Sequence, residues 1–334
     1  MGLIDNVTRD YLEDADIFAD AFNYLLYRGK HVIKPEHLTA LQTVRLVKKK
    51  GEKSLKYIER TRDLLKGAVI QQSADSTYLI LGIESQSYVD YGMPVRNMLM
   101  NAMEYNAQID NLRAIYQYTK ELSDDEFLSG MKKDDKLKPV ITLVIFFSGK
   151  RWDGARKLSD LIEDMDENKR QFFHDYEITI IEPAVMEDEE FDKFDSNLRE
   201  VLKFMKYSQD KQKMGELLQS DEEYKRLTVK AAQVINTCAK LGIEIEEGME
   251  AVDVCQAWDD QKKDGIIEGR IEGRREGRQQ GRREGIVGII KMAINYGGDK
   301  EFVIKSLLDN MSGMTVEEAE REYEQYMIAN INHS

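Results

Sequence analysis

The sequence predicts a mixed α/β protein that continues into an all-helical C-terminal region. Apolar runs of strand length occur between residues 64 and 181, and the run at 140–147 is apolar throughout, as in a buried central strand. From residue 188 onward, apolar residues recur at helical spacing, and glycine recurs at every fourth position from 265 to 285. We therefore expect a mixed region at 1–185, a helical region at 186–264, the repeat at 265–285 and a C-terminal helical segment at 286–334.

Composition narrows the class of protein. The 334 residues are 42% hydrophobic, which is enough for a substantial core, and carry a net charge of −14. That charge argues against a generally basic nucleic-acid-binding surface but leaves a local basic patch open. Acidic residues occupy the N-terminal positions where a signal peptide would be basic, and no apolar run approaches the roughly 18 residues of a membrane helix. Two cysteines in a chain of this length indicate a reducing compartment and not a disulfide scaffold. We therefore expect a cytoplasmic protein without a membrane partner.

The N-terminal segment is expected to form one helix at 11–28, followed by a loop-rich connector at 29–56. In the helix, Asp16, Asp20 and Asn23 are three or four residues apart and form a polar stripe beside the apolar one. Such a stripe is commonly a solvated helix face. The alternative is that one of its acids points toward the pair of acids described next.

A hairpin between residues 62 and 96 organises the candidate site. If its two apolar runs pair antiparallel around Ser73 and Ala74, the numbers of paired residues sum to 147, and Asp63 lies opposite Glu84. Gln86 shares that face because side chains alternate along a strand. Two adjacent carboxylates at the end of an apolar hairpin need a proton or a cation, and Mg²⁺ prefers such oxygen ligands. The alternative is a surface hairpin with two unrelated acids at its end.

Basic residues follow two of the expected elements. Arg96 projects from the first turn of a helix expected at 93–109, where Pro94 fits the first helical turn. Lys150 and Arg151 directly follow the central strand and precede Trp152. This second group would contact a phosphate backbone, or would simply be the end of a strand next to a packed tryptophan.

The glycine repeat has two explanations. It is a charged flexible linker, or a helix whose glycine stripe lets a second backbone approach closely. Glycine costs roughly 1 kcal/mol relative to alanine inside a helix, so a strict period of four favours the packing role. We expect a helix that self-associates, giving a homo-oligomer, or that packs against another domain. A DNA-contacting arginine face comes second, because interspersed glutamates nearly cancel its charge.

Several of these features occur together in one known family. They are an acid-bearing first helix (ADIFADAFN), an aspartate that opens a strand, GIESQ at 82–86, MPVR at 93–96, Tyr105, the strand VITLVIFF before Trp152, and the GR-EGR repeat. In this order, the chain resembles the recombination-promoting nucleases (Rpn), also called putative transposases, of the PD-(D/E)XK nuclease superfamily. The resemblance covers most of the sequence.

The resemblance implies a restriction-endonuclease-like core, in which a mixed sheet is flanked by helices. Members of this fold cut phosphodiesters with Mg²⁺ held by an Asp and a Glu on neighbouring strands, and Asp63 and Glu84 match those positions. The lysine usually found two residues after the Glu is here Gln86, as in this family's E-x-Q pattern. A neutral amide can orient a water molecule but cannot supply positive charge. The metal-binding acid of the first helix maps to Asp16 or Asp20.

The expected function is therefore a metal-dependent DNA endonuclease associated with recombination or mobile elements. Its cofactor would be Mg²⁺ or another divalent cation, and Arg96, Lys150 and Arg151 would bind DNA. Met100 stands where the family pattern has a tyrosine. The alternative is a catalytically weak or inactive nucleic-acid-binding or interaction protein that retained the fold. Gln86 and the acidic net charge favour that alternative.

Overall fold

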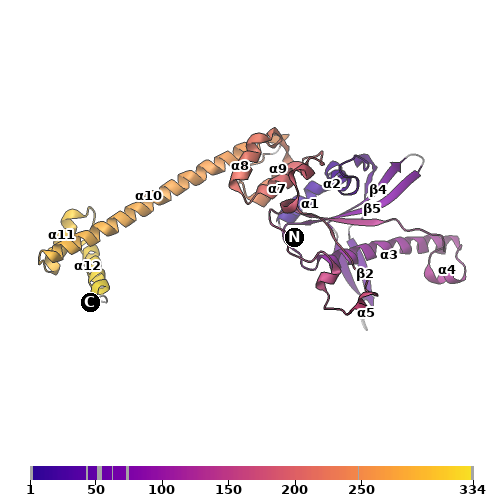
Figure 1. Ribbon diagram of the computed structural model, residues 1–334, viewed down its shortest axis with the longest axis horizontal. Coiled ribbons are helices and arrows are strands. Elements are labelled where there is room, and N and C mark those ends of the chain that lie inside the picture. The colour runs from indigo at the N-terminus through magenta and orange to yellow at the C-terminus, as the bar shows by residue number, and fades with distance from the viewer. Residues whose placement is uncertain are drawn as a thin grey trace. The chain divides into compact units, whose positions relative to one another are not determined.

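The computed structural model describes residues 3–42, 44–50, 55–61, 63–72, 75–246 and 248–331. The chain divides into two compact units, Met1–Trp258 and Asp259–Ser334 (Figure 1). The first unit contains the sheet and the helices that cover it. The boundary expected at residue 185 falls inside this unit, because helices beyond it share the hydrophobic core of the sheet.

The central element is a five-stranded mixed sheet in the order β1-β4-β5-β6-β7. Its strands are β1 (Leu38–Ala40), β4 (Leu64–Gln72), β5 (Asp75–Gln86), β6 (Val140–Phe146) and β7 (Thr179–Ile181). The β1–β4 and β4–β5 pairs are antiparallel, whereas β5–β6 and β6–β7 are parallel. The expected mixed sheet flanked by helices is thus confirmed.

The register of the β4–β5 hairpin is also the expected one. Leu64 pairs with Ile83, and the numbers of all paired residues sum to 147. Ser73 and Ala74, the expected centre of the turn, lie outside the described residues. This register brings the start of β4 next to the end of β5.

Helices cover both faces of the sheet. The helices α1 (Leu3–Glu13), α2 (Ala15–Tyr27), α7 (Leu198–Tyr207) and α9 (Val229–Ala239) share one core with alternate residues of the strands, including Leu81 and Ile83. The opposite face, with Ile80 and Val144, packs beneath α3 (Met93–Thr119). Figure 1 shows α2 and α3 on opposite sides of β4 and β5. Alternation along β5 therefore assigns each side chain to one helical layer.

Three expectations for local structure were wrong. The loop-rich connector contains β1 and a separate hairpin, β2 (Val44–Lys50) with β3 (Leu55–Thr61). The N-terminal segment forms two helices, α1 and α2, instead of one. The helix expected at 93–109 continues to Thr119.

The remaining elements are mostly short and helical. They are η1 (Pro35–His37), α4 (Asp124–Ser129), η2 (Leu158–Leu161), α5 (Glu167–Arg170), η3 (Pro183–Val185), α6 (Asp188–Phe191), α8 (Lys211–Ser220), η4 (Glu222–Lys225), β8 (Leu227–Thr228), β9 (Ala251–Val252), α10 (Val254–Asn295), α11 (Lys300–Asn310) and α12 (Val316–Ile331). The pair β8–β9 is a small exception to the helical character expected beyond residue 188. Every helix in the described part of the chain is too short or too polar to cross a lipid bilayer.

The glycine repeat is helical throughout, as part of α10. A Cβ atom built at Gly269, Gly273, Gly277 or Gly281 would have no atom of the described chain within 4 Å. No other described segment of this chain therefore packs against that stretch of the stripe. Association with a second copy stays a prediction. The C-terminal unit has its own small core, formed by Ile286, Ile290, Ala293, Val303, Leu307 and Ala319.

Candidate active site at the end of the β4–β5 hairpin

Asp63 and Glu84 lie at the end of the hairpin where β4 begins and β5 ends. Asp63 immediately precedes the pair Leu64–Ile83, and its Oδ2 atom accepts a hydrogen bond of 2.9 Å from the backbone N–H of Ser85. Glu84 lies two residues before the end of β5, and its side chain is fully buried beneath α3. The antiparallel register thus places the two carboxylates at neighbouring positions of adjacent strands.

Arg96 connects the two acids electrostatically. Its Nη2 atom lies 2.9 Å from Oε2 of Glu84, and its Nη1 atom lies 3.6 Å from Oδ2 of Asp90. Burial lowers the pKa of Arg96, but the negative charges of Glu84, Asp63 and Asp90 outweigh that effect and raise it. The guanidinium is therefore held in its charged form by three carboxylates.

Asp63 differs from an ordinary surface carboxylate. Burial raises its pKa above the usual 3.8. The Ser85 N–H, Arg96 and Arg9 oppose this shift because each favours the ionised form, whereas the charge of Asp5 adds to it. A carboxyl group with a raised pKa exchanges its proton closer to neutral pH, as many catalytic groups do.

Helix α1 contributes residues that the sequence analysis missed. The hydroxyl of Ser85 donates to Oγ1 of Thr8 at 2.7 Å, and the hydroxyl of Ser87 contacts Oδ1 of Asp5 at 3.3 Å. Arg9, one turn along, lies close enough to favour ionisation of Asp63. The sequence signal that could have revealed α1 was the helical spacing of Thr8, Tyr11 and Leu12, which are its buried residues.

Two buried amides belong to the same layer as Glu84. Gln86 is buried and follows Glu84 by two positions, so both face α3. Asn97 is fully buried, and its side-chain amide has no hydrogen-bond partner among the described residues. One turn further along α3, Asn101 accepts a hydrogen bond from Thr142 on β6, so this face of α3 is directed at the sheet. An unsatisfied buried amide costs about 1–3 kcal/mol, which is more often tolerated where function requires it.

The structure does not bring Asp16 or Asp20 to this acid pair. The carboxylate of Asp20 accepts hydrogen bonds from the backbone N–H groups of Asp195 and Ser196, the latter at 2.9 Å, just before α7. Asp16 and Asp20 line a different cavity. Helix α2 covers the face of the sheet opposite to Glu84, and Asp20 holds α2 against the start of α7 instead.

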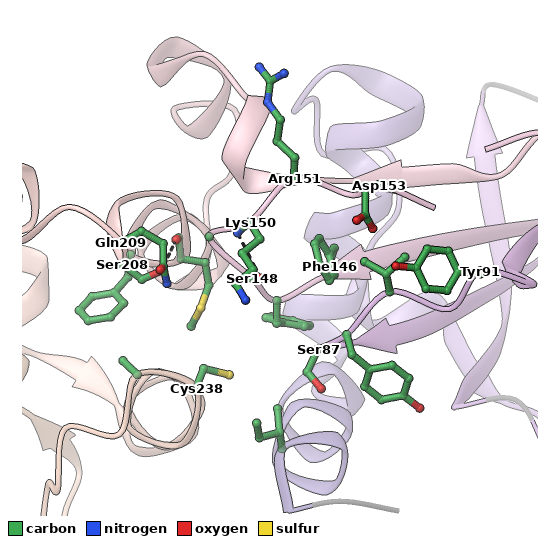
Figure 2. Close-up of a pocket in the computed structure, with 18 of the residues that line it drawn as sticks. Ser87, Tyr91, Phe146, Ser148, Lys150, Arg151, Asp153, Ser208, Gln209 and Cys238 are labelled. Atoms are coloured by element: carbon green, nitrogen blue, oxygen red, sulfur yellow. Dashed lines mark hydrogen bonds between the residues drawn. The ribbon is translucent and has the colours of Figure 1, made fainter. Parts of the chain in front are cut away.

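Lys150 and Arg151 are exposed and follow β6, near the end of β5. They line a cavity of about 540 Å³ together with Ser87 and Tyr91, which come directly after β5 (Figure 2). In Figure 2, the side chain of Arg151 extends away from the centre of the cavity. Because β5 and β6 are parallel, the expected basic residues lie at the same end of the sheet as Glu84.

The donor set is compatible with a loosely held Mg²⁺ ion. Mg²⁺ is commonly bound through one or two carboxylates together with substrate phosphates, and Asp63 and Glu84 supply two carboxylates. No group of three or more His, Cys, Asp or Glu side chains within the described ranges is arranged to hold a metal by itself. In this structure, the positive charge that faces Glu84 is the guanidinium of Arg96.

The fold and the acid pair define a class of mixed α/β proteins in which two acidic residues lie at the ends of neighbouring strands of the central sheet. A family model described as "Putative transposase, YhgA-like" matches residues 5–234, which include the sheet, the acid pair and helices α1 to α9 up to residue 234. The chain belongs to this family, and the resemblance to Rpn nucleases of the PD-(D/E)XK type is thereby supported. Searches of curated proteins and of solved structures found no match.

Proposed function

We propose that this chain is a Mg²⁺-dependent DNA endonuclease that acts in recombination or in the movement of mobile elements. The observation that carries the proposal is the convergence of Asp63 and Glu84 on Arg96 at one end of a mixed sheet. Membership of a transposase family supports DNA as the partner. The fold by itself would not, because one fold hosts many functions.

Each residue has a role in this proposal. Asp63 and Glu84 would hold the metal ion, which supplies a water molecule of lowered pKa and stabilises charge on the phosphate when bound. The amide of Gln86 would orient that water through a hydrogen bond. Lys150 and Arg151 are exposed and would contact phosphates on either side of the cleaved bond.

The experiment that tests the proposal is a plasmid-nicking assay with the purified full-length chain in Mg²⁺ and in EDTA. Asp63→Asn should reduce Mg²⁺-dependent nicking to background, because the substitution removes a charged ligand and preserves the shape of the side chain. Asp110→Asn is the matched control, since Asp110 is an exposed residue of α3. Equal Mg²⁺-dependent nicking by Asp63→Asn and the wild type would refute the proposal.

One observation favours a second function, that of a nucleic-acid-binding protein without cleavage. The 2.9 Å pair between Arg96 and Glu84 already neutralises one of the two acids, as a bound cation would. In that case, the wild type would bind DNA with equal affinity in Mg²⁺ and in EDTA, and would not nick it. The same nicking assay, combined with a binding titration, separates the two functions.

A further inference from the structure

Two exposed tyrosines lie on the segment that joins β5 to α3. The side chains of Tyr88 and Tyr91 are 60% and 62% exposed. Both line the 540 Å³ cavity that Lys150 and Arg151 also border, and Figure 2 shows Tyr91 beside Asp153 at one side of it. Two solvent-exposed aromatic rings thus line the same cavity as two exposed basic residues.

The segment that carries these rings is held firmly. Between the tyrosines, Val89 packs on the core around Met93, Phe146 and Trp152. Oδ1 of Asp90 accepts a hydrogen bond of 2.9 Å from the N–H of Gly92, and the N–H of Met93 donates to the carbonyl of Asp90 at 3.1 Å. The rings are therefore presented outward by an anchored turn, so little ordering is needed when they bind a ligand.

Tyr88 is also close to the arginine that faces the acid pair. Tyr88 lies near enough to Arg96 to influence the pKa of its guanidinium, and Arg96 contacts Glu84 at 2.9 Å. Both tyrosines directly follow the end of β5 that carries Glu84, so a strand bound there under the proposed function would extend past the segment that holds the rings.

Stacking chemistry identifies the ligand. In a duplex, the faces of the bases are covered by their neighbours, so an aromatic side chain can stack only on a base that is unstacked or flipped out. Aromatic stacking contributes about 1–3 kcal/mol per base and tolerates any sequence. The exposed lysine and arginine would bind the phosphates of the same strand.

We propose that the substrate of the site is a single strand, or a duplex with unpaired bases at the cut, held by stacking on Tyr88 and Tyr91. This inference rests on the proposed nuclease function and specifies its substrate. The chemistry of an unstacked base on a phosphate backbone is shared by DNA and RNA, so both are tested.

The test is fluorescence anisotropy with the full-length chain in EDTA, using a short labelled oligonucleotide as single-stranded DNA, as single-stranded RNA and as a blunt DNA duplex. The double variant Tyr88→Ala/Tyr91→Ala should bind single strands at least about tenfold more weakly, with duplex binding within about twofold of the wild type. Tyr88→Phe/Tyr91→Phe keeps the rings and should bind like the wild type. Tyr118→Ala is the matched control, because Tyr118 is 90% exposed at the far end of α3. The melting temperature of each variant verifies its fold.

Equal losses for single strands and duplex, no loss, or the same loss in Tyr118→Ala would overturn the inference. Tyrosine-dependent binding of RNA alone would assign the surface to RNA and would contradict DNA as the substrate. Nicking that depends on Asp63 but not on the tyrosines refutes the stacking surface alone. Tyrosine-dependent binding without Asp63-dependent nicking refutes the nuclease function alone.

Discussion

Replacing Arg96 with methionine tests whether the acid pair needs a positive charge. Breaking a fully buried ion pair costs about 3–5 kcal/mol, because the remaining charge is left in a poorly solvated place. Glu84 is fully buried, but the side chain of Arg96 is 33% exposed, so solvent screens part of the interaction. We therefore expect Arg96→Met to lower the free energy of unfolding of the first unit by about 2–3 kcal/mol.

Urea denaturation followed by tryptophan fluorescence measures this change. Trp152 and Trp258 are the two tryptophans of the chain, and both lie in the first unit, so the signal reports that unit. Adding Glu84→Met to Arg96→Met should recover most of the loss, because an apolar pair has no buried charge to solvate. The control is Arg113→Met on the same helix. Arg113 and Asp110 form an exposed pair at 3.1 Å, and their loss should change the free energy of unfolding by no more than about 0.5 kcal/mol.

Mg²⁺ provides a second readout that does not depend on cleavage. If a divalent cation binds between the acids, it should stabilise Arg96→Met more than the wild type, since the guanidinium no longer competes. At a Mg²⁺ concentration a hundredfold above Kd, the gain is about 2.7 kcal/mol. An Arg96→Met variant as stable as the wild type, with no response to Mg²⁺, would refute this account of the acid pair.

Three further predictions follow from individual residues. Because burial raises the pKa of Asp63, the folded chain binds its proton more tightly than the unfolded chain does, so the contribution of Asp63 to wild-type stability should fall as pH rises from 3.8 through the folded pKa. Asp63→Asn should lack that fall, and identical pH profiles of urea midpoints would contradict the shift. Asn97→Leu should raise the free energy of unfolding by about 1 kcal/mol and lower Mg²⁺-dependent nicking, since it removes an unsatisfied buried amide from the helix that covers Glu84. A less stable variant would mean that the amide has a partner. Alanine at Gly273, Gly277 and Gly281 should stabilise α10 by up to about 1 kcal/mol per residue, because each Cβ would enter open space. Circular dichroism and sedimentation check this, and a loss of stability or of oligomeric mass would reveal a second backbone on the stripe.

Much of the sheet could be predicted because its signals are local. The run at 140–147 is apolar at every position, and the hairpin register follows from two apolar runs around one short turn. The β2–β3 hairpin could not be predicted, since the lysines at 48–50 are more typical of an exposed loop than of a strand. Helix α1 was missed because Thr8, the first of three residues that it buries at helical spacing, is polar and hides the pattern.

The candidate site was predictable to the extent that it depends on the hairpin. Asp63 and Glu84 are brought together by β4 and β5, whose pairing the sequence indicates directly. Asp20 could not be placed, because its hydrogen-bond partner Ser196 lies 176 residues away in the chain. Nothing within α2 itself distinguishes an acid that fixes another helix from an acid that binds a metal.

The packing of α1 against α9 affects when the site can form during synthesis. Lys230 of α9 donates a hydrogen bond to Oδ1 of Asp14, at 2.8 Å, just after α1, although the two residues are 216 positions apart. Arg9 and Asp5 of α1 act on Asp63, and α1 packs against α9, so we expect the electrostatic environment of the acid pair to be complete only after α9 has left the ribosome. Domains generally fold as units during translation, at roughly 5–20 residues per second. A nascent chain in which the strands have been synthesised but α9 has not would therefore carry both acids without an assembled site. We expect added protease to cleave ribosome-bound chains stalled before α9 within the β4–β5 hairpin.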